Sequence, residues 1–324
     1  MSNKSKLSTE SYKGVRDFYP EDMAIQNYIF EVWRKTAKSF GYVEYGASIL
    51  EPAELYRTKS SEEIVNDQMF IFKDRGDREV ALRPEMTPTL ARMIAGKRKS
   101  IKFPLRWFSM PNLFRYEKPQ RGRKREHWQL NCDVLGIVGI EAEVEILSLA
   151  CSIMKAFGAK DKDFEIRVND RGLFEEVFER ISGVSKSTKE MVIRLLDKQE
   201  KIDNFNEEMI RHLGHEKKEL FLELLEKTKS TKRLDEIKGI LISKGISNVV
   251  IDTKIARGFD YYTGMVFEVF DAHKDNNRSL FGGGRYDNLL EIFGVEPVPA
   301  VGFGMGDVTI RDFLETHNLQ TCEK

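Results

Sequence analysis

The sequence predicts an α+β protein: an antiparallel β-sheet flanked by helices, with a helical insertion domain. Strand-like apolar segments occur in runs between helical segments, without the regular alternation that marks a parallel α/β sheet. A stretch at about residues 172–245 is heavily charged and almost entirely helical in pattern, and strand patterns return after it. We therefore expect a core formed by residues 1–171 and 247–324, interrupted by a helical insertion at 172–246.

The elements before the insertion follow from apolar spacing and from glycine and proline boundaries. Ile25 and Trp33 share one side of the first helix, which Gly41 ends. Pro84 and Pro88 stand near the start of a second helix. In chain order we expect a helix at 21–40, a strand at 41–50, a hairpin at 68–74 and 78–82, a helix at 84–96, strands at 105–117 and 126–137, a helix at 139–158 and a strand at 163–170.

After the insertion, three apolar segments predict strands at 248–256, 265–271 and 299–306. The stretch "FGGGRYD" at 281–287 is rich in glycine, which predicts a turn. Because glycine has no Cβ, the backbone there can approach a ligand closely.

Composition excludes several classes of protein. Lys plus Arg and Asp plus Glu both number 52, so any polyanion site must be a local patch. Cys132, Cys151 and Cys322 lack metal-ligand spacing, which argues against a zinc site and for a reducing compartment. The N-terminus has no apolar signal core, and no apolar run approaches the roughly 20 residues that span a bilayer. We expect a soluble cytoplasmic protein with no membrane partner.

Two polar stretches lie between predicted strands, where they suit a pocket better than a core. "RGFDYYTG" at 257–264 combines charge with two tyrosines. The loop "KPQRGRKR" at 118–125 is strongly basic, and a solvated loop is its ordinary explanation. Arg115 and Gln129 in the flanking strands favour a polyphosphate or nucleic-acid contact instead, because guanidinium groups bind phosphate oxygens bidentately.

Each further motif is weak by itself. Glu85 and Thr87 fit the chemistry of a helix N-terminus, and Tyr261 and Tyr262 fit a core with satisfied hydroxyls. "GGGRYD" matches neither dinucleotide nor P-loop spacing. Specificity comes from the order "KGVRDFYPEDM", "LRPEMTPTLARM", "FRYEKPQRGRKREHWQLNCDVLG", "RGFDYYTGMVFE", "GGGRYDNLL" and "PAVGFGMG". Together, over about residues 12–316, these motifs resemble the catalytic half of histidyl-tRNA synthetase, a class II aminoacyl-tRNA synthetase.

The resemblance implies a ligase that activates histidine with ATP and Mg²⁺ to histidyl-adenylate and transfers it to tRNA(His), working as a homodimer. Catalysis would fall to Arg115 and Arg257, which contact the α-phosphate. The residues implied for histidine are Glu85, Thr87, Gln129, Asp133, Tyr261, Tyr262 and Tyr286. Those implied for ATP are Arg115, Glu117, Arg123, Arg257 and Gly304. No resident metal ligand is implied among the protein side chains.

The sequence departs from the family pattern at several points. Thr309 stands where an ATP-binding arginine is usual, and Arg285 or Arg121 could compensate, whereas Arg311 should point elsewhere on its helix. Ser48 replaces the usual proline of the dimer interface, and Asp133 a frequent glutamate. The sequence ends at residue 324, where the family's anticodon-binding domain would begin, so that domain is expected to be absent.

Two alternatives to the synthetase stay open. A non-catalytic, histidine-binding regulatory subunit of ATP phosphoribosyltransferase also resembles the synthetase core and lacks the anticodon domain. The helical insertion, the basic loop and Arg257 argue against it. A weaker alternative is a synthetase-derived module that binds tRNA or protein without catalysis.

Overall fold

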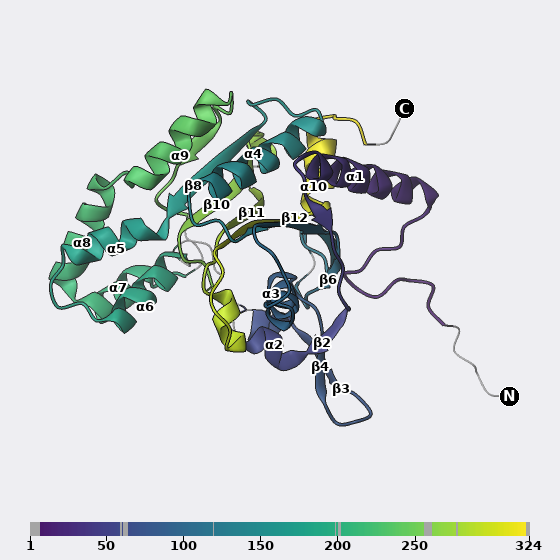
Figure 1. Cartoon of the computed structure of the whole chain (residues 1–324), viewed down its shortest axis with the longest axis horizontal. Coiled ribbons are helices and arrows are strands. Elements are labelled where there is room, and N and C mark those ends of the chain that lie inside the picture. The colour runs from purple at the N-terminus through teal and green to yellow at the C-terminus, as the bar shows by residue number, and fades with distance from the viewer. Residues whose placement is uncertain are drawn as a thin grey trace.

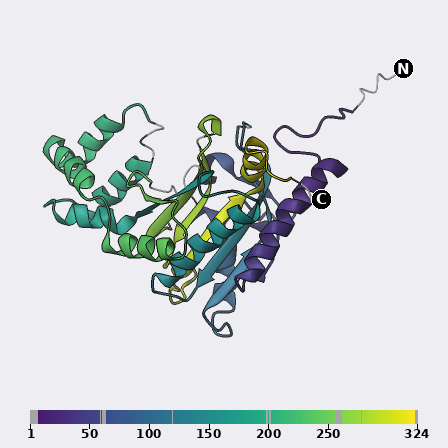
Figure 2. The ribbon, with the colours of Figure 1, turned by 90° about the horizontal axis from the view of Figure 1, so that it is seen from above.

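The computed structural model describes residues 7–58, 60, 64–118, 120–197, 199, 202–255, 261–276 and 278–321. It confirms the α+β class: a mixed sheet runs through the core and helices flank it (Figures 1 and 2). Within the described ranges, no helix is both long enough and apolar enough to cross a bilayer.

The main sheet is antiparallel except at its two edges. Its strands follow the order β1 (Val43–Glu44), β5 (Leu105–Ser109), β7 (Glu126–Leu135), β12 (Ala300–Gly306), β11 (Ser279–Arg285), β10 (Met265–Asp271), β8 (Phe164–Asp170) and β9 (Val249–Ile251), with β6 (Asn112–Phe114) paired to β7. The pairs β1–β5 and β8–β9 are parallel. Each of these pairs is joined by a long crossover, which a parallel pair requires.

Helices cover one face of the sheet and part of the other (Figure 1). The fully covered face packs against α1 (Pro20–Ser39), α4 (Glu141–Ala156), α9 (Lys232–Ser243) and α10 (Asp307–Thr316) in one large apolar core. On the opposite face, α3 (Thr87–Gly96) and the 3₁₀-helix η3 (Leu289–Phe293) form a second apolar cluster. That face is only partly covered, which leaves room for a site.

The remaining small elements lie beyond α3. A separate sheet has the order β2 (Leu50–Pro52), β4 (Glu79–Leu82) and β3 (Phe70–Lys73), beside α2 (Ala53–Arg57) and the π-helix η1 (Ile64–Gln68). The 3₁₀-helix η2 (Lys274–Asn276) precedes β11. The predicted hairpin is confirmed as β3–β4, whereas the predicted strand at 41–50 is divided between β1 and the start of β2, which belong to different sheets.

The charged middle of the chain forms α5 (Arg171–Glu179), α6 (Lys186–Asp197), α7 (Phe205–Leu213) and α8 (His215–Lys227), at the left of Figure 1. These helices have their own apolar core, in which the Phe178 and Phe221 rings stack with centroids 4.8 Å apart. By contrast, Leu234 and Ile237 of α9 pack into the main core. By packing, α9 therefore groups with the sheet rather than with the helices that precede it.

The prediction of a turn at 281–287 is wrong, because most of this stretch is strand β11, between β10 and β12. Glycine often marks a turn, but here it permits close packing between strands. A Cβ on Gly283 would lie 1.9 Å from the carbonyl oxygen of Gly302. The glycine-rich stretch does allow a close approach of the backbone. Gly283 packs closely against the neighbouring strand β12, and Gly282 lines the cavity above the sheet.

Candidate active site

The site lies on the partly covered face of the sheet, and strand alternation builds it. In β12 the apolar side chains of Val301, Phe303 and Met305 enter the core, so Gly302 and Gly304 lie on the other face. The register pairs Gly302 with Gly284, and Gly304 with Gly282 of β11. Two cross-strand pairs of glycines therefore leave this part of the face without side chains.

Neighbouring side chains fill part of the space that the glycines leave. A Cβ on Gly302 would lie 2.0 Å from Asp133 Oδ1, and one on Gly304 would lie 2.7 Å from Cδ of Gln129. A Cβ on Gly284 would lie 2.8 Å from the Tyr262 ring. These positions require glycine because the polar groups of the site occupy the volume of the missing side chains.

The cavity above this glycine face gathers most of the residues predicted for the site. Glu85 and Thr87 come from the start of α3, Arg115 follows β6, and the tyrosines flank β10 and β11. Its lining comprises Glu85, Thr87, Arg115, Gln129, Asn131, Asp133, Tyr261, Tyr262, Gly282, Tyr286, Gly302, Phe303 and Gly304. The set is mostly polar, with carboxylates, amides and hydroxyls converging from several elements, as expected of a binding site.

One buried carboxylate, Glu85, is held by hydroxyl groups. Ser60 donates a short hydrogen bond to Oε1, and the Tyr261 hydroxyl donates to Oε2 at 3.3 Å. Burial raises the pKa of Glu85, while the Ser60 hydrogen bond, the Arg115 charge and the Tyr261 hydrogen bond oppose that rise. Glu85 is therefore fixed in place and directed at the cavity by its neighbours.

A second buried carboxylate, Asp133, lies across the cavity lining in β7. The Tyr286 hydroxyl donates a short hydrogen bond to Asp133 Oδ1. Burial raises the pKa of Asp133 to about 7, and the hydrogen bond from Tyr286 works against that rise. Tyr261 packs against both Tyr286 and Tyr262, with ring centroids 5.8 and 4.9 Å apart. The three tyrosines thus form a wall beside Asp133.

The raised pKa of Asp133 makes stability depend on pH. Its native pKa of about 7 exceeds the unfolded value of about 3.9. The native carboxyl therefore holds its proton more tightly, so its stabilisation is complete below about pH 4 and is lost as the pH rises to about 7. We expect Asp133→Asn to gain about 4 kcal/mol of unfolding free energy relative to wild type across this window. Urea unfolding of both proteins between pH 4 and 8 measures this, and a constant difference would contradict it.

Some predicted residues lie outside the cavity lining. Glu117 lies just before the basic loop, and Arg123 Nε is 3.7 Å and Arg115 Nη1 4.0 Å from its carboxylate. Arg115 also donates from Nε to the carbonyl of Pro84 at 2.8 Å, which joins the loop to the residue before Glu85. Arg257 lies outside the described residues, as does Cys322.

Sequence reasoning missed two residues at the cavity. Asn131 lines it from β7, and its position between Gln129 and Asp133 in strand alternation is a signal that could have identified it. Ser60 reaches Glu85 from a different part of the chain, and nothing in the sequence marks that contact.

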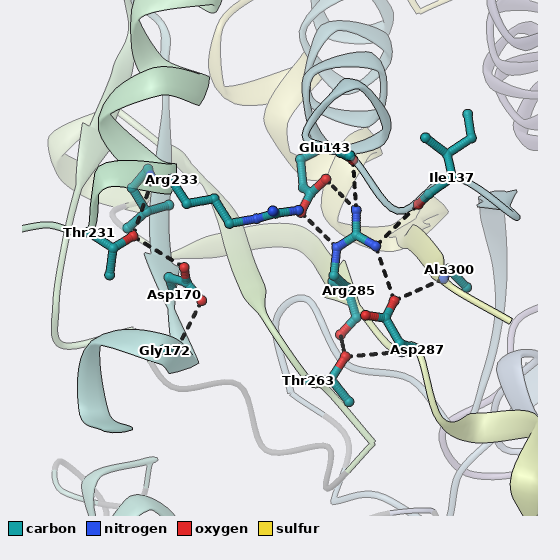
Figure 3. A network of polar contacts seen from close by, with 12 residues as sticks. Ile137, Glu143, Asp170, Gly172, Thr231, Arg233, Thr263, Arg285, Asp287 and Ala300 are labelled. Atoms are coloured by element: carbon teal, nitrogen blue, oxygen red, sulfur yellow. Dashed lines mark hydrogen bonds and ion pairs between the residues drawn. The ribbon is translucent and has the colours of Figure 1, made fainter. Parts of the chain in front are cut away.

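The suggested compensation for Thr309 is not supported. The Arg285 guanidinium is held by Glu143 of α4, with Nε 2.7 Å from Oε1 and Nη2 2.5 Å from Oε2, on the α4 side of the sheet (Figure 3). Arg121 is paired with Asp312 at 2.9 Å. Arg311 forms ion pairs with Asp22 and Glu315. Thr309 itself donates its hydroxyl to the carbonyl of Leu280 at 2.7 Å.

Comparison with known proteins agrees with the motifs. A family model described as histidyl-tRNA synthetase matches residues 14–308. The chain is 47% identical to a histidine–tRNA ligase of Leptospira biflexa, with 97% of this chain and 76% of that protein covered. It is 41% identical to a histidine–tRNA ligase of Opitutus terrae, with 96% of this chain and 76% of that protein covered.

Solved structures support the same fold. Histidyl-tRNA synthetase from Nostoc sp. PCC 7120 aligns with a TM-score of 0.78 and 21% identity, covering 97% of this chain and 77% of that chain. A Bacillus halodurans protein described as an ATP phosphoribosyltransferase regulatory subunit/histidyl-tRNA synthetase gives 0.79 and 24%, with 96% and 83% covered. At such identities these structures establish the fold alone. On the family model and the curated relatives, the chain belongs to the histidyl-tRNA synthetase family.

Proposed function

We propose that this protein is a histidine–tRNA ligase: it activates histidine with ATP and transfers the histidyl group to tRNA(His). The observation that carries the proposal is the pairing of two buried carboxylates in one cavity, Glu85 and Asp133, with Arg115 at its edge. Free histidine offers a matching set of groups: an ammonium, an imidazole and a carboxylate. The curated relatives have the same activity in their names.

Histidine would bind through both carboxylates. Glu85, Thr87 and Gln129 offer acceptors to the three N–H donors of the ammonium group. Asp133 and the Tyr262 hydroxyl would take the two imidazole nitrogens, while Tyr261 and Tyr286 close the pocket. A buried polar slot of this kind rejects amino acids that cannot make both ring contacts, because its polar groups would then lose their partners.

Activation would proceed by in-line displacement. A carboxylate oxygen of histidine attacks the α-phosphorus of ATP, the bond to the bridging oxygen breaks, and pyrophosphate leaves. A terminal ribose hydroxyl of tRNA then attacks the histidyl carbonyl, and AMP leaves. Arg115 and Arg257 would neutralise charge on the α-phosphate, and the protein acts mainly by positioning and electrostatics.

ATP would enter as its Mg²⁺ complex. Mg²⁺ takes one or two protein carboxylates together with substrate phosphates. Glu117 fits this need, since its buried Oε2 has no hydrogen-bond partner among the described residues. Arg123 beside it would meet the outer phosphates, and Gly304 would contribute its backbone to the ATP site beside Gln129.

Several wider features belong to the same proposal. A homodimer in the cytoplasm is proposed from the family resemblance. The helices α5–α8 are proposed as the body of an insertion domain within 172–246, with the core formed by 1–171 and 247–324.

The regulatory-subunit alternative is not favoured. The matched relatives are named as ligases, and the chain spans about 76% of their length. The cavity, moreover, keeps Arg115 and the acceptors around Glu85 in one place.

The first test is exchange of labelled pyrophosphate into ATP, which needs no tRNA. We expect exchange that depends on histidine and falls by at least about a hundredfold in Arg115→Ala and in Arg257→Ala, because each removes a charge that the transition state needs. Charging of tRNA(His) transcripts would then complete the assignment. Histidine binding without exchange in the wild-type protein would refute the ligase and favour the regulatory subunit.

A further inference from the structure

The tip of the basic loop is a tight turn that rests on the end of the main sheet. Gln120 and Arg123 exchange backbone hydrogen bonds of 3.2 and 3.0 Å around it. Gly122 has φ +76°, a left-handed conformation that favours glycine. The basic loop thus starts shortly after Arg115, which lines the cavity, and the position of the turn at its tip must be set by contacts elsewhere.

Arg278, just before β11, supplies one of those contacts. Its Nη1 donates to the carbonyl oxygen of Arg121 at 2.8 Å. A Cβ on Gly122 would lie 3.2 Å from that same Nη1 and 3.8 Å from Cγ2 of Thr309. The Arg278 guanidinium and the Thr309 side chain therefore lie next to each other beneath the loop tip.

Arg278 keeps its charge available. Arg121 is neutralised by Asp312 at 2.9 Å, and Arg311 by Asp22 at 3.0 Å. No carboxylate within the described ranges forms an ion pair with Arg278, and its partner Arg121 offers only a neutral carbonyl. Its side chain is also exposed at the protein surface. A cation in this state can bind a ligand anion without first breaking an ion pair.

The position of Arg278, outside the inner pocket, suits a contact with ATP rather than with histidine. Gly282 of the cavity lies four positions after Arg278 along the chain, which is about 13 Å at 3.3 Å per residue of strand. Arg278 is thus too far out for the inner pocket, and it contacts the tip of the basic loop that follows Arg115. An ATP molecule whose α-phosphate reacts beside Arg115 must extend outward from the inner pocket.

We propose that Arg278 binds ATP, and that it supplies beside Thr309 the positive charge that Thr309 cannot. This inference rests on the proposed ligase function. The guanidinium group would bind phosphate oxygens as a planar fork, while its bond to Arg121 holds the loop tip over the nucleotide. Binding of ATP and placement of the loop are then coupled through one side chain.

The test measures KM for ATP and for histidine separately in pyrophosphate exchange. Arg278→Ala should raise KM for ATP about ten- to a hundredfold, the range of a lost charge-assisted hydrogen bond, and leave KM for histidine unchanged. The KM for ATP of Arg278→Lys should lie between those of the wild type and Arg278→Ala, since lysine keeps the charge but lacks the planar guanidinium fork. Arg311→Ala, which removes a nearby arginine already paired with carboxylates, is the matched control and should leave both values unchanged.

A second-site variant separates nucleotide binding from support of the loop. Adding Thr309→Arg to Arg278→Ala should restore most of the affinity for ATP, because it places a guanidinium in the same spot. An unchanged KM for ATP in Arg278→Ala would overturn the inference. So would an equal rise in both KM values that Thr309→Arg does not rescue, since that marks a structural role alone. Absence of exchange in the wild-type protein would instead refute the proposed function.

Discussion

Replacing Gly302 by alanine is expected to abolish histidine recognition while leaving a folded protein. The new Cβ would lie 2.0 Å from Asp133 Oδ1 and 2.8 Å from the carbonyl oxygen of Cys132. Asp133 must then rotate or the strand must shift, and either change disturbs the hydrogen bond with Tyr286. A displacement of about 1 Å at a reacting site can cost about a hundredfold in rate, so kcat/KM for histidine should fall at least that much.

A matched control for Gly302→Ala exists in the same chain. Gly239 lies within α9, and a Cβ there would meet nothing within 4 Å. Gly239→Ala should leave exchange unchanged and add up to about 1 kcal/mol of stability, because alanine is the better helix former. A folded Gly302→Ala protein with normal KM for histidine would show that Asp133 is not part of the recognition site.

Apolar patterns in the sequence indicate most strands of the sheet, whereas the cavity residues were predicted from the family resemblance, and alternation accounts only for those in β7 and β12. The apolar and glycine positions of 301–306 alternate, and so do the polar and apolar positions of 129–134. The glycine run at 282–284 was misjudged because its cause is a neighbouring strand, Gly302 and Phe303, which local propensity does not reveal.

Contacts between distant segments could not be predicted from local patterns. The resemblance to a family supplied Glu85 and Asp133 together, but the support of Glu85 by Ser60 depends on how two segments meet. Arg278 and Thr309 also come together only in the folded chain. Arg285 was considered as a nucleotide ligand because its charge was visible, whereas its buried partner Glu143 was hidden in the apolar face of a helix.

The pair of Glu143 and Arg285 should be the most sensitive electrostatic contact for stability. Glu143 is fully buried in α4 and accepts from Arg285 and from Arg233 of α9, whose Nη2 lies 2.5 Å away (Figure 3). Arg285 also donates to the carbonyls of Ile137 and Gly139. Without the charge of Glu143, the buried Arg285 keeps only Asp287 as a counter-ion, 3.1 Å from Nη1, and loses the two contacts with Glu143.

Glu143→Gln should therefore lower the unfolding free energy by about 3–5 kcal/mol, as measured by urea denaturation. The exposed pair of Arg57 and Glu79, 2.6 Å apart, supplies the control, and Glu79→Gln should leave the unfolding free energy nearly unchanged because solvent screens an exposed pair. Stability should recover only when both buried charges are replaced. The double variant Glu143→Met with Arg285→Met should therefore be more stable than Glu143→Gln. If the double variant is the less stable of the two, the network contributes more than compensation of charge: it then holds β11, and with it Tyr286, in position for the site.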